Sequence, residues 1–167
     1  MKDEKKKNYF KEFLPYLCII VLVLFIKSFI MSPIKVNGVS MVPTLHDSDI
    51  MLLDEVSYRF TDIKRFDIVV VKREGEYLIK RVIGLPGEEV EYRDNKLYIN
   101  GKKIKEKYTR EETFDFTASV GDNQYYVLGD NRLNSTDSRI FGAVMRDEIV
   151  GKTNLTVFPF SRFGTKK

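Results

Sequence analysis

Hydrophobic positions are unevenly distributed along the chain, with one long apolar run near the amino terminus and only short runs after it. The long run, FLPYLCIIVLVLFIKSFIM, occupies residues 13–31 and has almost no polar face. As a helix it would span about 28 Å, close to the thickness of about 30 Å of a bilayer core. Because a helix packed in a soluble core normally keeps a polar face, the pattern predicts a transmembrane anchor at 13–31 rather than a buried helix.

The residues that flank this run predict its orientation. Residues 1–12 form a basic tail with five lysines and three acidic residues, and lysines before an apolar run favour a cytoplasmic amino terminus. A cleaved signal peptide is the alternative, but the run is longer than a usual signal-peptide core, and Met31-Ser32-Pro33 is not a small-x-small cleavage site. We therefore expect a single-pass protein of the cell membrane, in contact with lipid, whose residues 32–167 form an extracytoplasmic domain.

Beyond residue 32 the apolar positions predict strands rather than helices. Short runs of strand-like composition lie at 49–53, 67–72, 77–84, 89–93, 96–101, 124–129 and 152–160. Turn-forming residues separate them, and VEYRDNKLYING predicts a β-hairpin around Asp94-Asn95. Residues 105–123 are polar and weakly patterned, so we expect a loop or an excursion there. The predicted fold class is mostly β, one domain of antiparallel sheets preceded by one N-terminal transmembrane helix.

Composition narrows the range of functions. The net charge is +4, of which the basic tail carries +2. A domain so close to neutral lacks the concentrated basic face that nucleic-acid binding needs. One cysteine, Cys18, and one histidine, His46, exclude an intrachain disulfide, a thiolate metal cluster and a multi-histidine metal site. We therefore expect no nucleic-acid partner, no metal and no cofactor.

The stretch NGVSMVPTL, residues 37–45, contains a candidate nucleophile, Ser40. A serine hydroxyl needs a neighbouring base to react at neutral pH. His46 follows six residues later, and nothing around it resembles a catalytic triad. A lysine is the known substitute, provided that burial lowers its pKa enough to make it neutral. By itself, a serine that follows an apolar run and lies two residues after a glycine is more often an ordinary loop residue.

The stretch YLIKRVIG, residues 77–84, offers a candidate base. Side chains alternate between the two faces of a strand, so Lys80 lies between Leu78 and Val82 on one face. The same alternation places Arg81 among isoleucines on the other face, and a lysine on a strand is more often a solvated edge residue. The pattern alone therefore leaves open which of the two basic residues is the base.

A third stretch, GDNRLNSTDSRIFG at residues 129–142, is unusually rich in hydrogen-bonding and charged side chains. Many loops with such a composition are only solvated turns. Alternatively, hydroxyls and ion pairs in one loop support a neighbouring site, because opposed Asp and Arg groups hold geometry more than they add stability.

These stretches, in this order behind an apolar run, resemble the bacterial type I signal peptidases, serine endopeptidases with a Ser/Lys dyad that remove signal peptides from secreted preproteins. NGVSMVPTL is similar to the nucleophile box of that family, YLIKRVIGLPGE to its lysine box, DIVVVK to the strand between them, and GDNRLNSTDSR to its last box. The resemblance extends from the anchor to Gly142. It implies a signal-peptidase-like catalytic domain in a Gram-positive-like form with a single anchor. A small or absent accessory β-domain is expected, because little sequence separates the last two boxes.

The resemblance implies that Ser40 is the nucleophile and Lys80 the general base. It also implies that Ser135 forms a hydrogen bond that orients Lys80. The oxyanion is expected to bind the backbone N–H of Ser40. Some relatives have a hydroxyl donor where this chain has Gly38, so the second donor remains open.

The resemblance also implies supporting ion pairs, Arg81 with Asp130 and Arg139 with Asp137. The substrates would be secretory preproteins with small residues at positions −1 and −3 of the signal peptide. The candidate walls of the pockets for these residues are Ile34, Val36, Met41, Leu45 and Ile79, each equally well explained by core packing. The chain departs from the family at Leu133, where the last box usually has an aspartate, and we assign no catalytic role to this position.

Two rival functions remain. A self-cleaving repressor-type protease shares the Ser/Lys chemistry, but it needs a soluble DNA-binding region instead of an apolar run. An inactive membrane-anchored scaffold for secretion partners is the other rival, although Ser40 and Lys80 are both present.

Overall fold

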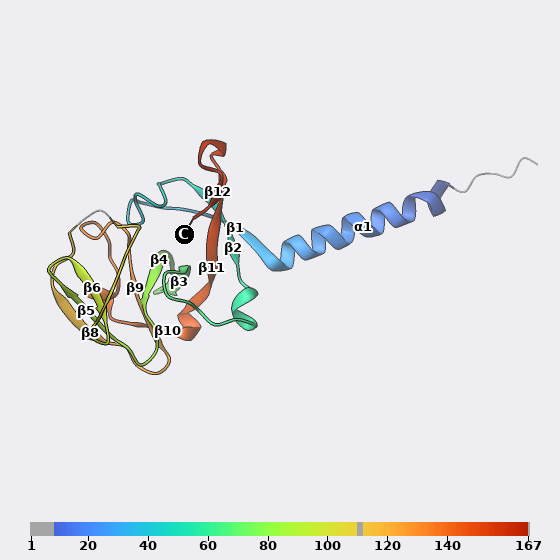
Figure 1. Ribbon diagram of the computed structural model, residues 1–167. Coiled ribbons are helices and arrows are strands. Elements are labelled where there is room, and N and C mark those ends of the chain that lie inside the picture. The colour runs from blue at the N-terminus through green and yellow to red at the C-terminus, as the bar shows by residue number, and fades with distance from the viewer. Residues whose placement is uncertain (1–8, 110–111, 167) are drawn as a thin grey trace, which may run out of the picture.

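The computed structural model describes residues 9–109 and 112–166, with the side chains of 9–12 and 24–30 excepted. Residues 1–8 of the predicted basic tail lie outside the described residues. The chain begins with helix α1 (Tyr9–Ile30), which extends away from a body of β-sheets (Figure 1). The apolar run was predicted to end at Met31, but this residue is the first of strand β1.

Side chains on α1 are exposed from Phe13 to Val23. No helix in the described part of the chain has both the length and the apolar content that a membrane crossing requires. The anchor at 13–31 stays a prediction.

The larger of two sheets contains eight strands, all paired antiparallel. Its order is β1-β2-β11-β3-β4-β9-β10, and β12 pairs with β11. The strands are β1 (Met31–Lys35), β2 (Ile50–Asp54), β3 (Ile68–Arg73), β4 (Glu76–Gly84), β9 (Gln124–Leu128), β10 (Val144–Met145), β11 (Ile149–Phe158) and β12 (Gly164–Thr165). Strand β11, from the end of the chain, lies between β2 and β3, so the sheet joins residues that are far apart in sequence.

The smaller sheet has the order β7-β6-β5-β8 and forms a separate lobe in Figure 1. Its strands are β5 (Glu89–Arg93), β6 (Lys96–Ile99), β7 (Lys102–Ile104) and β8 (Phe116–Ser119). The hairpin predicted around Asp94-Asn95 is present, and both residues are in the left-handed region, with φ of 51° and 59°. Such angles are those of a type I′ turn, whose twist matches the twist of the two strands.

All seven predicted strands are present, and the predicted mostly antiparallel β fold is confirmed. The segment 105–123, expected to be a loop or an excursion, contains strand β8, so a loop over its whole length was wrong. The remaining helices are short: α2 (Ser138–Phe141) and the 3₁₀ turns η1 (Ser57–Arg59), η2 (Arg146–Glu148) and η3 (Phe160–Arg162).

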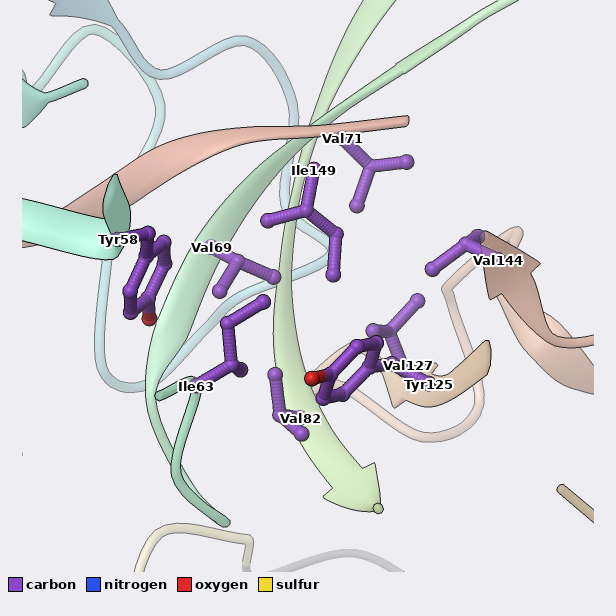
Figure 2. Close-up of a cluster of buried hydrophobic side chains, with 9 residues drawn as sticks. All are labelled: Tyr58, Ile63, Val69, Val71, Val82, Tyr125, Val127, Val144 and Ile149. Atoms are coloured by element: carbon purple, nitrogen blue, oxygen red, sulfur yellow. The ribbon is translucent and has the colours of Figure 1, made fainter. Parts of the chain in front are cut away.

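Strand β3 is covered on both faces. Val69 and Val71 belong to the hydrophobic cluster shown in Figure 2. Ile68 and Val70 belong to a second cluster, which also contains the predicted pocket residues Val36, Met41, Leu45 and Ile79. This second cluster holds the segment after β1, and thereby Ser40, against the sheet.

Candidate active site

Ser40 lies in a turn after β1, and the buried residues next to it hold that turn in place. Met41 is 1% exposed and Leu45 is fully buried. The Leu45 N–H donates to the Met41 carbonyl at 2.9 Å, and the Asn131 N–H donates to the Ser40 carbonyl at 3.0 Å. This turn around Ser40, the nucleophile turn, is therefore attached to the core. It is also attached to residues 129–139, which we call the loop of the last box.

Lys80 lies on β4, opposite Val69 of β3. It is only 3% exposed, and its Nζ donates to Ser40 Oγ at 2.9 Å. Burial lowers the pKa of Lys80 below its usual 10.5, and the nearby negative charges of Asp137 and Asp130 oppose this shift only in part. A buried amine with a lowered pKa, at hydrogen-bond distance from a hydroxyl, can accept the proton of that hydroxyl.

His46 makes no comparable contact with Ser40. The His46 backbone N–H donates to Asp49 Oδ2 at 3.0 Å, and its ring Nδ1 is buried without a hydrogen-bond partner among the described residues. The geometry therefore favours the lysine over the histidine as partner of Ser40.

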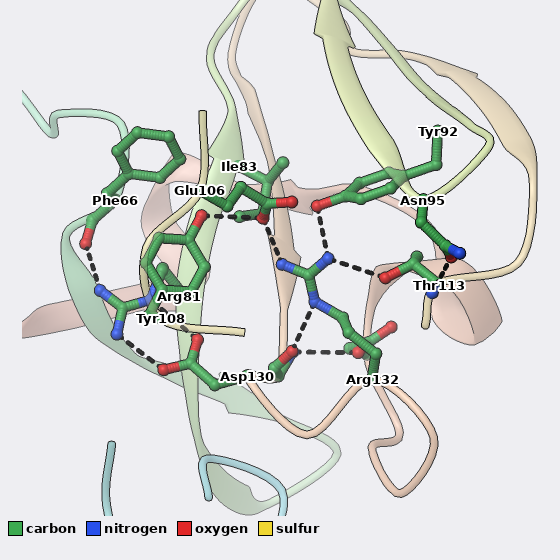
Figure 3. Close-up of polar contacts among 12 residues, drawn as sticks. Phe66, Arg81, Ile83, Tyr92, Asn95, Glu106, Tyr108, Thr113, Asp130 and Arg132 are labelled. Atoms are coloured by element: carbon green, nitrogen blue, oxygen red, sulfur yellow. Dashed lines mark hydrogen bonds and ion pairs between the residues drawn. The ribbon is translucent and has the colours of Figure 1, made fainter. Parts of the chain in front are cut away.

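Arg81, the other basic residue on β4, has a different partner. Its Nε and Nη2 donate to the two carboxylate oxygens of Asp130 at 2.8 and 2.7 Å, and both side chains are fully buried (Figure 3). Nη1 donates to the Phe66 carbonyl at 2.9 Å, and Thr44 Oγ1 donates to Asp130 at 2.5 Å. Because Thr44 follows Ser40 by four residues, this ion pair joins the nucleophile turn, β4 and the last box.

The ion pair expected between Asp137 and Arg139 is also present. Arg139 Nε and Nη2 each donate to the carboxylate at 2.8 Å. Asp137 is fully buried, caps α2 and accepts the Gly129 N–H at 3.0 Å. Asp137 therefore holds both ends of the loop of the last box.

Gly129 is packed tightly between the nucleophile turn and the side chain of Ser135. A Cβ at this position would lie 2.5 Å from the Ser40 carbonyl oxygen and would overlap the side chain of Ser135. Ser135 therefore lies beside the nucleophile. However, the predicted hydrogen bond to Lys80 is absent, because Ser135 Oγ is buried without a partner among the described residues.

A pocket of about 240 Å³ opens beside Ser40 and Lys80. Three of the five predicted wall residues, Val36, Met41 and Ile79, line it. The other two do not line it: Leu45 is fully buried within the second hydrophobic cluster, and Ile34 packs against that cluster. The pocket is also lined by Lys35, Asn37, Gly38, Val39, Tyr77, Leu78, Asn134 and Thr136.

Gly38 has φ of 85°, a left-handed conformation that favours glycine. Its N–H donates to Asp47 Oδ1 at 2.7 Å, and hydrogen bonds from Gly38 and Ser48 lower the pKa of Asp47. The Gly38 N–H is therefore already occupied, so Gly38 is a poor candidate for the second oxyanion donor.

The structure adds a buried cluster around Arg132 that sequence reasoning did not identify as part of the site (Figure 3). Arg132 Nη2 donates to Glu106 Oε1 at 2.5 Å, Nη1 donates to Tyr92 and Thr113, and Nε donates to the Gly129 carbonyl at 3.0 Å. Arg132 was visible in the polar loop, but its partner Glu106 lies in the weakly patterned segment, which carried no signal. The smaller sheet therefore contacts the loop of the last box directly.

The described residues contain no group of three or more His, Cys, Asp or Glu side chains placed to hold a metal ion.

An antiparallel β fold with a serine beside a buried lysine, next to a pocket, is typical of a serine peptidase. The profile of the family described as "Signal peptidase, peptidase S26" matches residues 7–158. Signal peptidase I of Bacillus amyloliquefaciens is 36% identical to this chain over an alignment of 185 positions, which covers 100% of both chains. Signal peptidase I T of Bacillus subtilis is 38% identical over an alignment of 180 positions, which covers 98% of this chain and 93% of the relative.

A solved structure is similar as well. The crystal structure of a signal peptidase I from Enterococcus faecalis V583 shares 42% identity and a TM-score of 0.51, covering 55% of this chain and 97% of its own. The chain therefore belongs to the signal peptidase family, peptidase S26. The resemblance to the bacterial type I signal peptidases is confirmed, and with it the prediction of an enzyme.

Proposed function

We propose that this protein is a membrane-anchored serine endopeptidase that removes N-terminal signal peptides from secreted preproteins, with Ser40 as nucleophile and Lys80 as general base. One observation carries the assignment: Lys80 Nζ lies 2.9 Å from Ser40 Oγ, and the lysine is almost completely buried. Burial disfavours the ammonium form, so the neutral amine needed for a base is accessible at lower pH than in a free lysine.

The reaction would proceed in two steps. Neutral Lys80 takes the proton of Ser40 as the serine oxygen attacks the scissile carbonyl, and the ammonium then protonates the leaving amine. The signal peptide remains as an ester on Ser40, and Lys80 activates the water that hydrolyses it. The Ser40 backbone N–H would donate to the oxyanion. Asp130 and Asp137 hold the loop of the last box against the nucleophile turn.

The pocket beside Ser40 would receive the end of the signal peptide. Its apolar walls, Val36, Met41 and Ile79, suit apolar side chains. The proposed preference for small residues at −1 and −3 rests on the resemblance to the family. Ser135 is proposed to support the dyad through its contact at Gly129 rather than through a hydrogen bond.

The proposed anchor is the apolar segment 13–31, with the basic tail in the cytoplasm and the β domain outside. Its support is the apolar run itself and the exposure of the α1 side chains between Phe13 and Val23. Such an anchor would hold the active site near the membrane surface, where the apolar core of a signal peptide positions the scissile bond.

The test is cleavage of a purified preprotein by the full-length chain in lipid or detergent, beside Ser40→Ala and Lys80→Ala. We expect cleavage after a small-x-small sequence, and loss of cleavage in both variants while circular dichroism shows the β fold retained. The control Lys96→Ala removes an exposed lysine of β6 and should cleave normally. Lack of cleavage of several preproteins by the folded wild-type chain would instead favour an inactive scaffold.

A further inference from the structure

Residues 37–39, which we call the pocket edge, line the pocket beside Ser40 and are held differently from the residues on either side. Before the edge, Val36 is buried, and its N–H and carbonyl form hydrogen bonds of 2.8 and 2.9 Å with the backbone of 48–49. After the edge, the Ser40 carbonyl accepts the Asn131 N–H at 3.0 Å. The three residues of the edge are all exposed, so packing contributes little to their position.

The pocket edge is connected to the rest of the domain mainly through the carboxylate of Asp47. The N–H of Gly38, its middle residue, donates to Asp47 Oδ1 at 2.7 Å. Among the described residues the edge has one other hydrogen bond, from the Val42 N–H to the Val39 carbonyl at 3.1 Å, and this bond lies within the nucleophile turn. Asp47 therefore continues the pairing of the two hairpin arms, β1 and β2, beyond the last hydrogen bond between their backbones.

The backbone next to Asp47 fixes the direction of its carboxylate. Ser48 has φ of 67°, an uncommon angle for a residue other than glycine, and such angles concentrate at functional sites. In this conformation the Ser48 N–H donates to the Val36 carbonyl, and Ser48 Oγ donates to Asp47 Oδ2 at 3.0 Å. Both carboxylate oxygens are thus occupied, one by Ser48 and one by Gly38, which leaves the carboxylate a single orientation.

From these contacts we infer that Asp47 is a positioning residue, which acts through Gly38 to hold the pocket edge where it receives the end of the signal peptide. The inference rests on the proposed function. Asp47 does not itself line the pocket, and Ser40 has its own anchor at Asn131. The effect should therefore fall on substrate binding. Without the carboxylate only a fraction of the molecules would present a formed pocket, and the apparent affinity falls by that fraction.

The experiment measures preprotein cleavage by the full-length chain with alanine or asparagine in place of Asp47. Asp47→Ala removes the acceptor of the Gly38 N–H, and we expect KM to rise about tenfold while kcat stays within about twofold. Asp47→Asn keeps a side-chain oxygen for this N–H and should restore KM to within about threefold of the wild type. The matched control is Asp115→Ala, because Asp115 is also exposed and accepts a backbone N–H, that of Asp94, at 3.1 Å in the smaller sheet. This control should leave KM unchanged.

Hydrogen exchange, followed by mass spectrometry on peptides that cover residues 36–40, tests the same contact without cleavage. Asp47→Ala should exchange faster there than the wild type, Asp47→Asn should not, and the strands should exchange as before in both variants. A role in general stability would instead speed exchange throughout the domain.

Three results would overturn the inference and leave the proposed function intact. The first is an unchanged KM in Asp47→Ala. The second is an equal rise of KM in Asp47→Asn, since the charge and not the acceptor would then matter. The third is a higher kcat in Asp47→Ala, which would mean that Asp47 occupies an N–H needed by the oxyanion. If the wild type cleaves no preprotein, the proposed function fails, and the exchange rates alone decide whether Asp47 holds the pocket edge.

Discussion

Replacement of Gly129 by alanine separates the packing of the active site from its chemistry. Gly129 is not among the glycines with left-handed backbone angles, so alanine can adopt its conformation and the effect is steric. The new Cβ would lie 2.5 Å from the Ser40 carbonyl oxygen. An ordinary contact between carbon and oxygen is about 3.4 Å, so the nucleophile turn or the opposing loop must move by about 0.9 Å.

A displacement of this size is large for a dyad joined by one hydrogen bond of 2.9 Å. Misplacement of reacting groups by about 1 Å costs about 100-fold in rate. We therefore expect Gly129→Ala to lower kcat/KM for a preprotein by about 100-fold, mainly through kcat. Overpacking should also lower the free energy of unfolding by about 1–3 kcal/mol.

Two other glycines provide matched controls, measured by preprotein cleavage and by urea unfolding. Gly151→Ala would overlap the Asp54 backbone in the pairing of β11 with β2, so it should lose stability but keep kcat per folded molecule. In Gly121→Ala the new Cβ contacts only the flexible side chain of Gln124, so this variant should change neither the stability nor kcat. If folded Gly129→Ala retains kcat within about threefold of the wild type, the close contact does not position Ser40.

Three further substitutions test the charges around the site. Burial lowers the pKa of Lys80 from 10.5, so between its folded pKa and 10.5 the unfolded state binds more protons and stability rises with pH. In urea unfolding, Lys80→Met should therefore have a larger free energy of unfolding than the wild type at neutral pH. This difference in free energy should become smaller towards pH 10.5. Asp130→Asn leaves the buried Arg81 without its charge partner and should cost about 3–5 kcal/mol in the free energy of unfolding. Glu106→Gln leaves the buried Arg132 without its charge partner and should lower the free energy of unfolding by about 3 kcal/mol. It should also lower kcat by more than the loss of folded enzyme explains.

The pair of Arg93 with Glu91 is the control for these ion pairs, since the Arg93 side chain is 55% exposed. Glu91→Gln should change the free energy of unfolding by less than about 1 kcal/mol. A similarly small change in Asp130→Asn would contradict a structural role for the buried pair. A stability gap between wild type and Lys80→Met that stays constant with pH would argue against a lowered lysine pKa. If Glu106→Gln leaves kcat per folded molecule unchanged, Glu106 contributes to stability and not to the geometry of the active site.

Much of the fold was predictable because its signals are local. Strands such as β3 and β5 show in the composition and alternation of a few consecutive residues, and the Asp94-Asn95 turn shows in two. The order of the strands was not predictable, since placing β11 between β2 and β3 depends on pairing across about a hundred residues. Short strands such as β10 and β12 have only two residues each and no period to detect.

The candidate site was also predictable only in part. The sequence by itself determined the family, through three motifs in order, and the residue types needed for hydroxyl and amine chemistry. Strand alternation is symmetrical between neighbouring positions and could not choose between Lys80 and Arg81 as the base, although the resemblance implied Lys80. Only the tertiary structure shows the contacts themselves: Lys80 donates to Ser40, whereas Arg81 is bound to Asp130. These contacts, like that of Glu106 with Arg132, depend on segments that meet only after folding.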